Sequence, residues 1–369
     1  MAQNHLVNLI KMAATFQEAV NEHYRGAGLQ YVDVPQIVGI TGACENIDTL
    51  FKVRSRVPVP LFFTQTGQLA LEQALQYYPG VFTSIHSGRD ELFEDERHLR
   101  QFKLTEEEFD WSMVSTRANA YDEEIMYEAL LQHIESAVKY ITKRIATSHV
   151  SLLQDVYKRD VAGLLASMEH PFLRISYQDA IELLKKNGYA DLAWGFDLEA
   201  EHEAKIVELL NIEERKMNSV LPKEDRAVII MKYPQEIKFF NMKQSEKDPR
   251  VVMSADLILP NAGESVGSAV REHKGDKLRE RLMGSTMFRL HKERGGTYDD
   301  FVWYTEELVA AGKTNPHAGY GLGNERLLQF IMGSKDIRDC SVFSLLARQT
   351  GDWEIKEHKT AAFEKMKMA

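Results

Sequence analysis

Residues 81–108 read VFTSIHSGRDELFEDERHLRQFKLTEEE. This stretch begins as an apolar strand and continues as arginines that alternate with carboxylates on the N-terminal side of Phe102. Arginine and carboxylate-bound magnesium together suit a polyphosphate, and an aromatic ring can stack on a base. An exposed hairpin tip crossed by salt bridges has the same composition. The stretch alone therefore leaves both a nucleotide site and a solvated tip open.

A second segment, residues 256–272, reads DLILPNAGESVGSAVRE. We expect Asp256 on a strand, Glu264 after a turn and Arg271 at the start of a helix. Carboxylates at strand ends can bind magnesium, and a buried arginine can anchor a substrate carboxylate or amide through two hydrogen bonds. Taken singly, each residue is better explained by a structural role, so their value lies in occurring together.

A third segment, residues 319–326, reads GYGLGNER and precedes the apolar run LLQFIMG. It predicts a glycine-rich turn that leads into a helix, with Arg326 on the first turn of that helix. A Rossmann site is excluded because the preceding KTNPHA is not an apolar strand. A P-loop is excluded because GxxxxGK followed by Ser or Thr does not occur in the chain.

The rest of the pattern predicts an α+β fold. Strands are expected at residues 29–40, 60–65, 80–87, 226–234 and 251–260, and helices at 6–24 and at about 122–146, 178–188, 200–217, 270–286 and 324–333. Pro35 places the first strand at a sheet edge. Strands and helices do not alternate regularly, so an antiparallel sheet fits better than a doubly wound parallel one. We expect one domain, 1–369, with a helical insertion at about 112–225.

Composition narrows the class of protein. The chain has 369 residues, 44% of them hydrophobic, and a net charge of −10, which opposes non-specific binding to nucleic acid. The most basic stretch, residues 271–294, also contains acids and is more simply a solvated helix face. No run of 18 apolar residues could span a membrane. Cys44 and Cys340 lie far apart in sequence, so a reducing compartment, the cytoplasm, is expected.

The three segments, in this order, resemble motifs of the class II aminoacyl-tRNA synthetases, and most closely those of the asparaginyl type. Arg89 and Glu91 match the Arg-x-Glu of motif 2, and residues 97–99 match its Arg-His-Leu. Arg326 matches the arginine of motif 3, while the Pro35 strand and the helix before it resemble motif 1. The resemblance implies an antiparallel sheet flanked by helices, and a homodimer formed through motif 1.

It also implies an ATP site with magnesium. Arg89 would hold the α-phosphate and Arg326 the far end of a bent ATP, so that these two are the catalytic pair. The remaining ATP contacts would come from Glu91, Arg97, His98, Phe102 and Glu264. Phe102 would stack on adenine, and Arg97 and His98 would contact the outgoing pyrophosphate. Asp256 and Glu264 would coordinate Mg²⁺.

The resemblance further implies an amino-acid pocket next to the ATP site. Gln68 and Glu106 would bind the α-amino group, and Arg271 the side-chain carbonyl. Aspartyl enzymes carry a lysine where this chain has Leu71, and the loss of this cation favours a neutral amide or an acid whose charge is compensated differently. The family's Gly-Gly-Ser-Gln-Arg is here residues 267–271, Gly-Ser-Ala-Val-Arg, so the side-chain pocket is expected to differ.

Motif 1 begins near residue 6, where the family carries an anticodon-binding domain before it, and the residues after Asp339 also depart from the family. We therefore expect an AMP-forming ligase that activates aspartate, asparagine or a close analogue. A non-tRNA acceptor, with ammonia as the leading candidate, is expected, and tRNA is considered an unlikely partner. A minimal asparaginyl-tRNA synthetase and a catalytically silent regulatory paralogue remain alternatives.

Overall fold

A computed structural model describes residues 2–40, 49–56, 59–91, 94–115, 120–218 and 221–350. Within them, an eight-stranded sheet has the order β1-β4-β5-β10-β9-β8-β7-β6. The strands are β1 (Gln30–Tyr31), β4 (Gly80–Gly88), β5 (Gln101–Asp110), β6 (Leu173–Ser176), β7 (Val228–Met231), β8 (Ser254–Leu259), β9 (Gly263–Val270) and β10 (His317–Gly323). Short strands β2 (Ile37–Val38) and β3 (Phe62–Phe63) pair separately. Only the edge pairs β1–β4 and β6–β7 are parallel, so the α+β prediction with an antiparallel sheet is confirmed.

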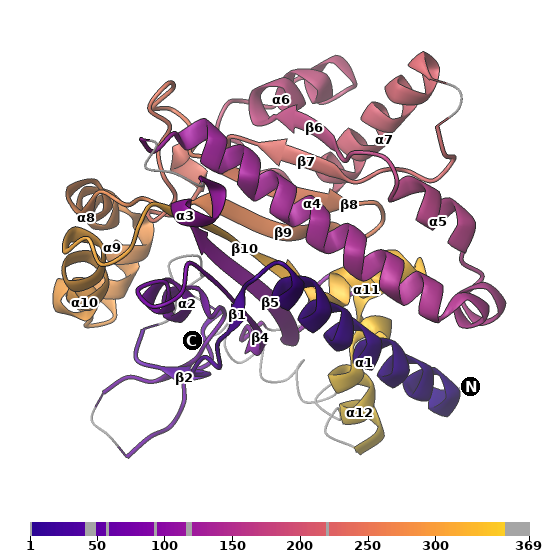
Figure 1. Cartoon of the computed structure of the whole chain (residues 1–369), viewed down its shortest axis with the longest axis horizontal. Coiled ribbons are helices and arrows are strands. Elements are labelled where there is room, and N and C mark those ends of the chain that lie inside the picture. The colour runs from indigo at the N-terminus through magenta and orange to yellow at the C-terminus, as the bar shows by residue number, and fades with distance from the viewer. Residues whose placement is uncertain are drawn as a thin grey trace, which may run out of the picture.

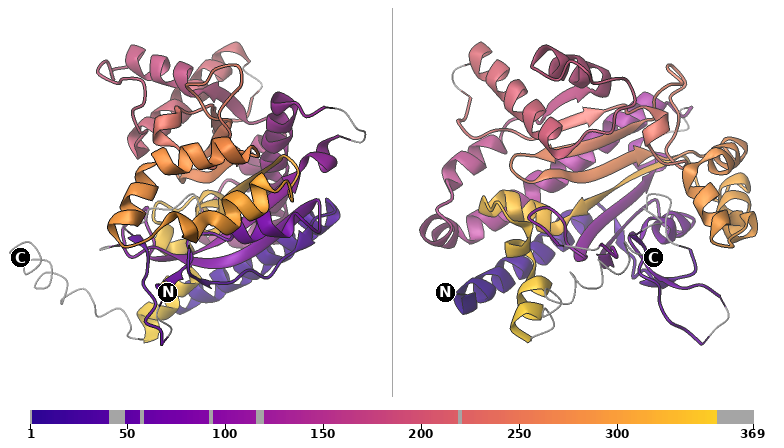
Figure 2. Two further views of the ribbon diagram at one scale, coloured as in Figure 1. Left: turned by 90° about the vertical axis from the view of Figure 1, so that its left-hand side faces the viewer. Right: turned by 180° about the vertical axis from the view of Figure 1, so that it is seen from behind.

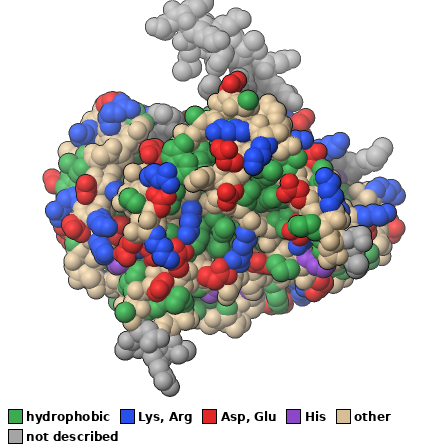
Figure 3. Space-filling model, turned by 90° about the horizontal axis from the view of Figure 1, so that it is seen from above, with side chains coloured by type: hydrophobic (Ala, Val, Ile, Leu, Met, Phe, Trp, Pro, Cys, Tyr) green, Lys and Arg blue, Asp and Glu red, His purple; other side chains and the backbone are tan. Residues whose placement is uncertain are grey.

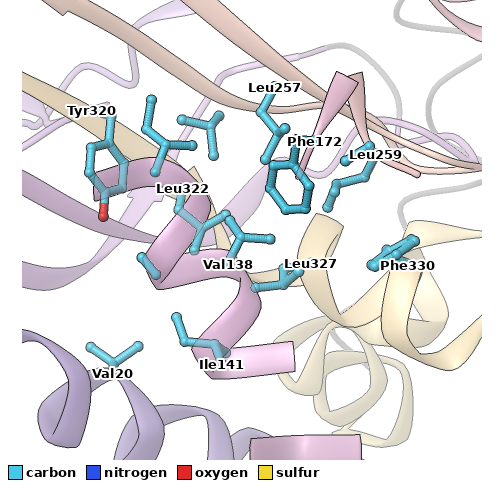
Figure 4. Close-up of a cluster of buried hydrophobic side chains, with 14 of the residues drawn as sticks. Val20, Val138, Ile141, Phe172, Leu257, Leu259, Tyr320, Leu322, Leu327 and Phe330 are labelled. Carbon is cyan, nitrogen blue, oxygen red and sulfur yellow. The ribbon is translucent and has the colours of Figure 1, made fainter. Parts of the chain in front are cut away.

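Two long helices, α1 (Ala2–Gly26) and α4 (Glu123–Ser148), run across one face of the sheet (Figure 1). Asp122 caps α4 by accepting hydrogen bonds from the backbone N–H groups of Glu124 and Ile125. Apolar residues then recur along α4 toward the sheet, where they join the main core. Figure 4 shows this core, in which α1, α4, β8, β10 and α11 (Asn324–Met332) contribute Val20, Val138, Ile141, Leu257, Leu259, Tyr320, Leu322, Leu327 and Phe330.

Helices border the opposite face of the sheet without crossing its middle, as the view from behind shows (Figure 2). Between β5 and β7 the chain forms α3 (Trp111–Val114), α4, α5 (Val161–Ser167), α6 (Tyr177–Lys186) and α7 (Ala200–Met217), together with β6. Between β9 and β10 it forms α8 (Gly275–Gly284), α9 (Thr286–Glu293) and α10 (Val302–Tyr304). The short α2 (Gln68–Ala74) packs on β4 and β5, and α12 (Val342–Thr350) packs on α1.

Charges of both signs are interspersed on the face seen from above, with small apolar areas between them (Figure 3). Among the described residues, no helix combines the length and the apolar character that crossing a bilayer requires. The single domain with a helical insertion at about 112–225, and the motif 1 homodimer, stay predictions.

Candidate active site

One cavity of about 520 Å³ collects every site residue that the sequence predicts. These residues come from α2, the β4–β5 hairpin, β8, β9 and the start of α11, and they are Gln68, Arg89, Glu91, Arg97, His98, Phe102, Glu106, Asp256, Glu264, Arg271 and Arg326. The cavity lies on the sheet face opposite α1 and α4, because alternate residues of β5 point to opposite faces: Glu106 and Glu108 line the cavity, while Glu107 bonds to His133 of α4.

Arginines line one end of the cavity. Arg89 follows β4, and its backbone N–H donates to the carbonyl of Arg100 across the hairpin. Its guanidinium lies 5.7 Å from the ring centre of Phe102 on β5, so cation and aromatic ring face the same space. Arg326 donates hydrogen bonds to the carbonyls of Ala262, at 2.8 Å, and Arg97, at 3.2 Å. The hairpin and α11 thereby hold cationic groups at one end, as an anionic ligand requires.

Acidic groups gather on β8 and β9 beside these arginines. Asp256 is buried, and its carboxylate accepts a hydrogen bond from the Lys238 ammonium at 2.5 Å. Burial raises the pKa of Asp256, Lys238 opposes this, and nearby Glu264 raises that pKa further. Carboxylate oxygens are the ligands that Mg²⁺ prefers, so Asp256 and Glu264 fit a magnesium ion chemically.

Two further groups at this end were missed by the sequence reasoning. Glu203 of α7 is buried, lies 3.7 Å from the Arg97 guanidinium, and accepts a hydrogen bond from the backbone N–H of Glu264. Burial and the charge of Glu264 raise the pKa of Glu203 to about 7. No sequence signal marks Glu203, since it lies on an amphipathic helix rich in acids. Lys238 lies in the loop between β7 and β8, and no motif of the sequence analysis includes it.

The other end of the cavity is built around Glu106. Its carboxylate accepts a hydrogen bond from the Thr66 hydroxyl and another, at 2.6 Å, from the backbone N–H of Gly67. Burial raises the pKa of Glu106 to about 7, against the effect of these two donors. The Gln68 amide lies one residue further along and donates to Glu72 at 2.7 Å. A carboxylate and an amide carbonyl thus lie together where an ammonium group can bind.

Arg271 forms the floor at this end. Its guanidinium donates to the Glu108 carboxylate at 2.6 and 3.1 Å, and both residues are buried.

The predicted place of Arg271 at the start of a helix is wrong, because Arg271 follows β9 and α8 begins only at Gly275. The predicted glycine-rich turn at 319–326 is wrong as well, since residues 317–323 form β10, a central strand of the sheet.

Comparison with known proteins places the chain among synthetases. A family model described as tRNA synthetases class II (D, K and N) matches residues 1–347. An asparagine–tRNA ligase of Pyrococcus abyssi is 32% identical over 91% of this chain and 67% of its own length, and an asparaginyl-tRNA synthetase of Mus musculus is 29% identical over 92% and 67%. The crystal structure of an asparaginyl-tRNA synthetase from Pyrococcus horikoshii complexed with asparaginyl-adenylate aligns with a TM-score of 0.76 and 29% identity, over 92% of this chain and 68% of that one.

These relatives overturn the expectation that tRNA is an unlikely partner. They are tRNA ligases by name, and their similarity extends over nine tenths of this chain. The net charge of the chain and the early position of motif 1 therefore do not argue against a tRNA acceptor.

Proposed function

Because the chain belongs to the class II tRNA synthetases of the D, K and N group, we propose that it activates asparagine with ATP and transfers the asparaginyl group to tRNA. The predicted enzyme class, an ATP-dependent ligase of this family, is confirmed. One observation supports the proposal above the others: cationic, acidic and amide groups from α2, the β4–β5 hairpin, β8, β9 and α11 line a single cavity, as adenylate formation requires.

At the cationic end, ATP would bind with its adenine on Phe102 and its α-phosphate near Arg89. Arg326 would hold the outer phosphates, and Arg97 and His98 would contact the pyrophosphate. Asp256 and Glu264 would hold Mg²⁺, which neutralises phosphate charge when bound. Lys238 would then have to move from Asp256 or share it, because its ammonium lies 2.5 Å from that carboxylate.

At the other end, Glu106 and the side-chain carbonyl of Gln68 would bind the α-ammonium group, leaving the α-carboxylate directed at the α-phosphorus. A carboxylate oxygen attacks that phosphorus in line, and the bond to pyrophosphate breaks. Arg89 would stabilise the charge that develops on the phosphoryl oxygens. A ribose hydroxyl at the tRNA 3′ end then attacks the activated carbonyl, and AMP leaves.

The side-chain pocket favours asparagine. Arg271 would donate to the amide oxygen and Glu108 would accept from the amide N–H₂, two demands that a carboxylate cannot meet together. In the sequence, Leu71 takes the position of the lysine of aspartyl enzymes, but its side chain packs with a buried apolar cluster and does not line the cavity. Discrimination through such complementary hydrogen bonds is strong, because a mismatched ligand leaves buried polar groups unpaired.

Charging of tRNA tests the proposal. With labelled asparagine, ATP and tRNA, the protein should form asparaginyl-tRNA, and Arg89→Ala should lower the rate by about 10²–10³, as expected for loss of a group that stabilises transition-state charge. Arg250→Ala is the matched control, since Arg250 is exposed, forms a salt bridge with Asp248 two residues away and does not line the cavity. Formation of asparagine from aspartate and ammonia, without charging of any tRNA, would contradict the proposed acceptor.

A further inference from the structure

Beneath the amino-acid end of the cavity lies a buried network of four ionisable side chains. Its members are Glu72 of α2, Glu108 of β5, Arg271 after β9 and His317 of β10, and each is at most 4% exposed. Arg271 binds Glu108 at 2.6 Å, and His317 binds Glu72 at 3.1 Å. Only the first of these pairs lines the cavity, and the second lies directly behind it.

The hydrogen bonds of His317 define its protonation. Its Nδ1 lies 2.9 Å from the backbone carbonyl of Asn315, and its Nε2 lies 3.1 Å from a carboxylate oxygen of Glu72. A carbonyl and a carboxylate can only accept, so both ring nitrogens must donate, and His317 is an imidazolium. Burial lowers the pKa of His317, but the hydrogen bond and charge of Glu72 outweigh burial and raise it.

Glu72 is correspondingly an anion. Besides His317, it accepts hydrogen bonds from the Tyr304 hydroxyl at 2.8 Å and from the Gln68 amide at 2.7 Å. Burial raises the pKa of Glu72, yet the hydrogen bond and charge of His317 lower it overall. Burial raises the pKa of Glu108 to about 7, so above that pH the network contains two cations and two anions. Although Glu72, Glu108 and His317 come close enough to share a metal ion, Arg271 and His317 already supply the balancing positive charge.

We propose that Glu72 and His317 determine amino-acid specificity by setting the net charge beneath the side-chain pocket at zero, so that an uncharged amide is accepted and a carboxylate is rejected. This inference rests on the proposed function. A bound aspartate would add a third anion to a buried site with two cations, whereas asparagine leaves the balance unchanged. Glu72 and His317 act through Arg271, Glu108 and Gln68, and are therefore positioning residues.

Removing one charge from the pair provides the test. His317→Gln removes the cation, leaves Glu72 as an unbalanced anion, and should raise the ratio of kcat/KM for asparagine to that for aspartate by about tenfold or more, since one charge at this distance is equivalent to 1–3 pKa units. Glu72→Gln keeps the shape but removes the group that holds the proton on buried His317, so both charges are lost together and the ratio should stay close to that of the wild type. The double variant, Glu72→Gln with His317→Gln, restores neutrality and should return the ratio toward that of the wild type.

That restoration separates charge balance from a purely structural role, under which the double variant would be at least as impaired as either single one. Tyr304→Phe is the matched control: it removes a hydrogen bond to Glu72 without changing charge, and should leave the ratio within about twofold. Pyrophosphate exchange with each amino acid measures all four variants, and thermal melts verify that each is folded.

The wild-type protein offers a second measurement that needs no variant. The titratable and charged groups around the network are Glu106, Glu108, Arg271, His273 and Tyr304. Burial raises the pKa of Glu108, so a fall from pH 8 to pH 6 adds a proton and with it positive charge. The asparagine-to-aspartate ratio should fall with it. Glu106 binds the α-ammonium that both substrates share, so its titration cancels in the ratio.

The outcomes distinguish this inference from the proposed function. Wild-type protein that activates neither amino acid would overturn both. Wild-type protein that activates asparagine, with a ratio that His317→Gln leaves unchanged, would overturn the inference alone. Should Glu72→Gln fail to fold, a ratio that changes neither in His317→Gln nor between pH 6 and pH 8 would overturn it equally.

Discussion

Three consecutive glutamates show how much a single residue's environment depends on strand geometry. Glu106, Glu107 and Glu108 are adjacent on β5, yet the first and third face the cavity and the second faces α4. Glu106 lies by the Thr66–Gly67 turn, Glu108 pairs with Arg271, and Glu107 pairs with His133 at 2.6 Å. The period-two alternation of a strand thus divides a uniform acidic run into two groups that line the cavity and one that binds a helix on the other face.

Glu106 predicts a pH dependence of amino-acid binding. Burial raises the pKa of Glu106 to about 7, so below that pH the Glu106 carboxylate of the free protein binds a proton. The protonated group has no negative charge with which to bind an α-ammonium group. KM for asparagine should therefore rise on going from pH 8 to pH 6, approaching about tenfold per pH unit below the pKa. Glu106→Gln should give a high KM that varies less with pH. A wild-type KM that is flat over this range would contradict the assignment.

At the scale of elements, helices were easier to predict than the strands that carry the site. The apolar periodicity of α1, α4 and α11 was visible in the sequence, and the structure contains these helices. The sequence pattern does not predict the strands β9 and β10, because both contain glycines, which are typical of turns. In β10 the glycines face the cavity, and only the packing of the neighbouring strands shows that they leave room for side chains of β5.

Gly319 of β10 illustrates this point and gives a prediction. A Cβ atom there would lie 2.2 Å from Cδ of Glu108 and 2.3 Å from the carbonyl of Glu107, so the strands would have to shift. Gly319→Ala should destabilise the protein by about 1–3 kcal/mol and raise KM for asparagine. Gly321→Ala is the control for stability, because its Cβ would meet Glu106 only at 3.6 Å, an ordinary contact. Thermal melts compare the two variants, and equal losses of stability would contradict this account.

At the scale of the whole molecule, the resemblance predicted which residues line the cavity but not the further residues that contact them. All of the predicted site residues line one cavity although they span residues 68–326. Glu72, Glu203, Lys238 and His317 were not assigned, because their partners are distant in sequence and only the tertiary structure brings them together. The prediction that tRNA is an unlikely partner was wrong because it depended on the net charge of the chain. Net charge is an average over the whole surface, whereas the family match extends over residues 1–347.

The most direct test of the central claim, that this chain activates asparagine as an adenylate, is an amino-acid screen by ATP–pyrophosphate exchange. With Mg²⁺-ATP, asparagine should stimulate exchange well above every other standard amino acid, aspartate included, and Arg89→Ala should abolish the stimulation. Stimulation by no amino acid, or only by an amino acid other than asparagine, would contradict it.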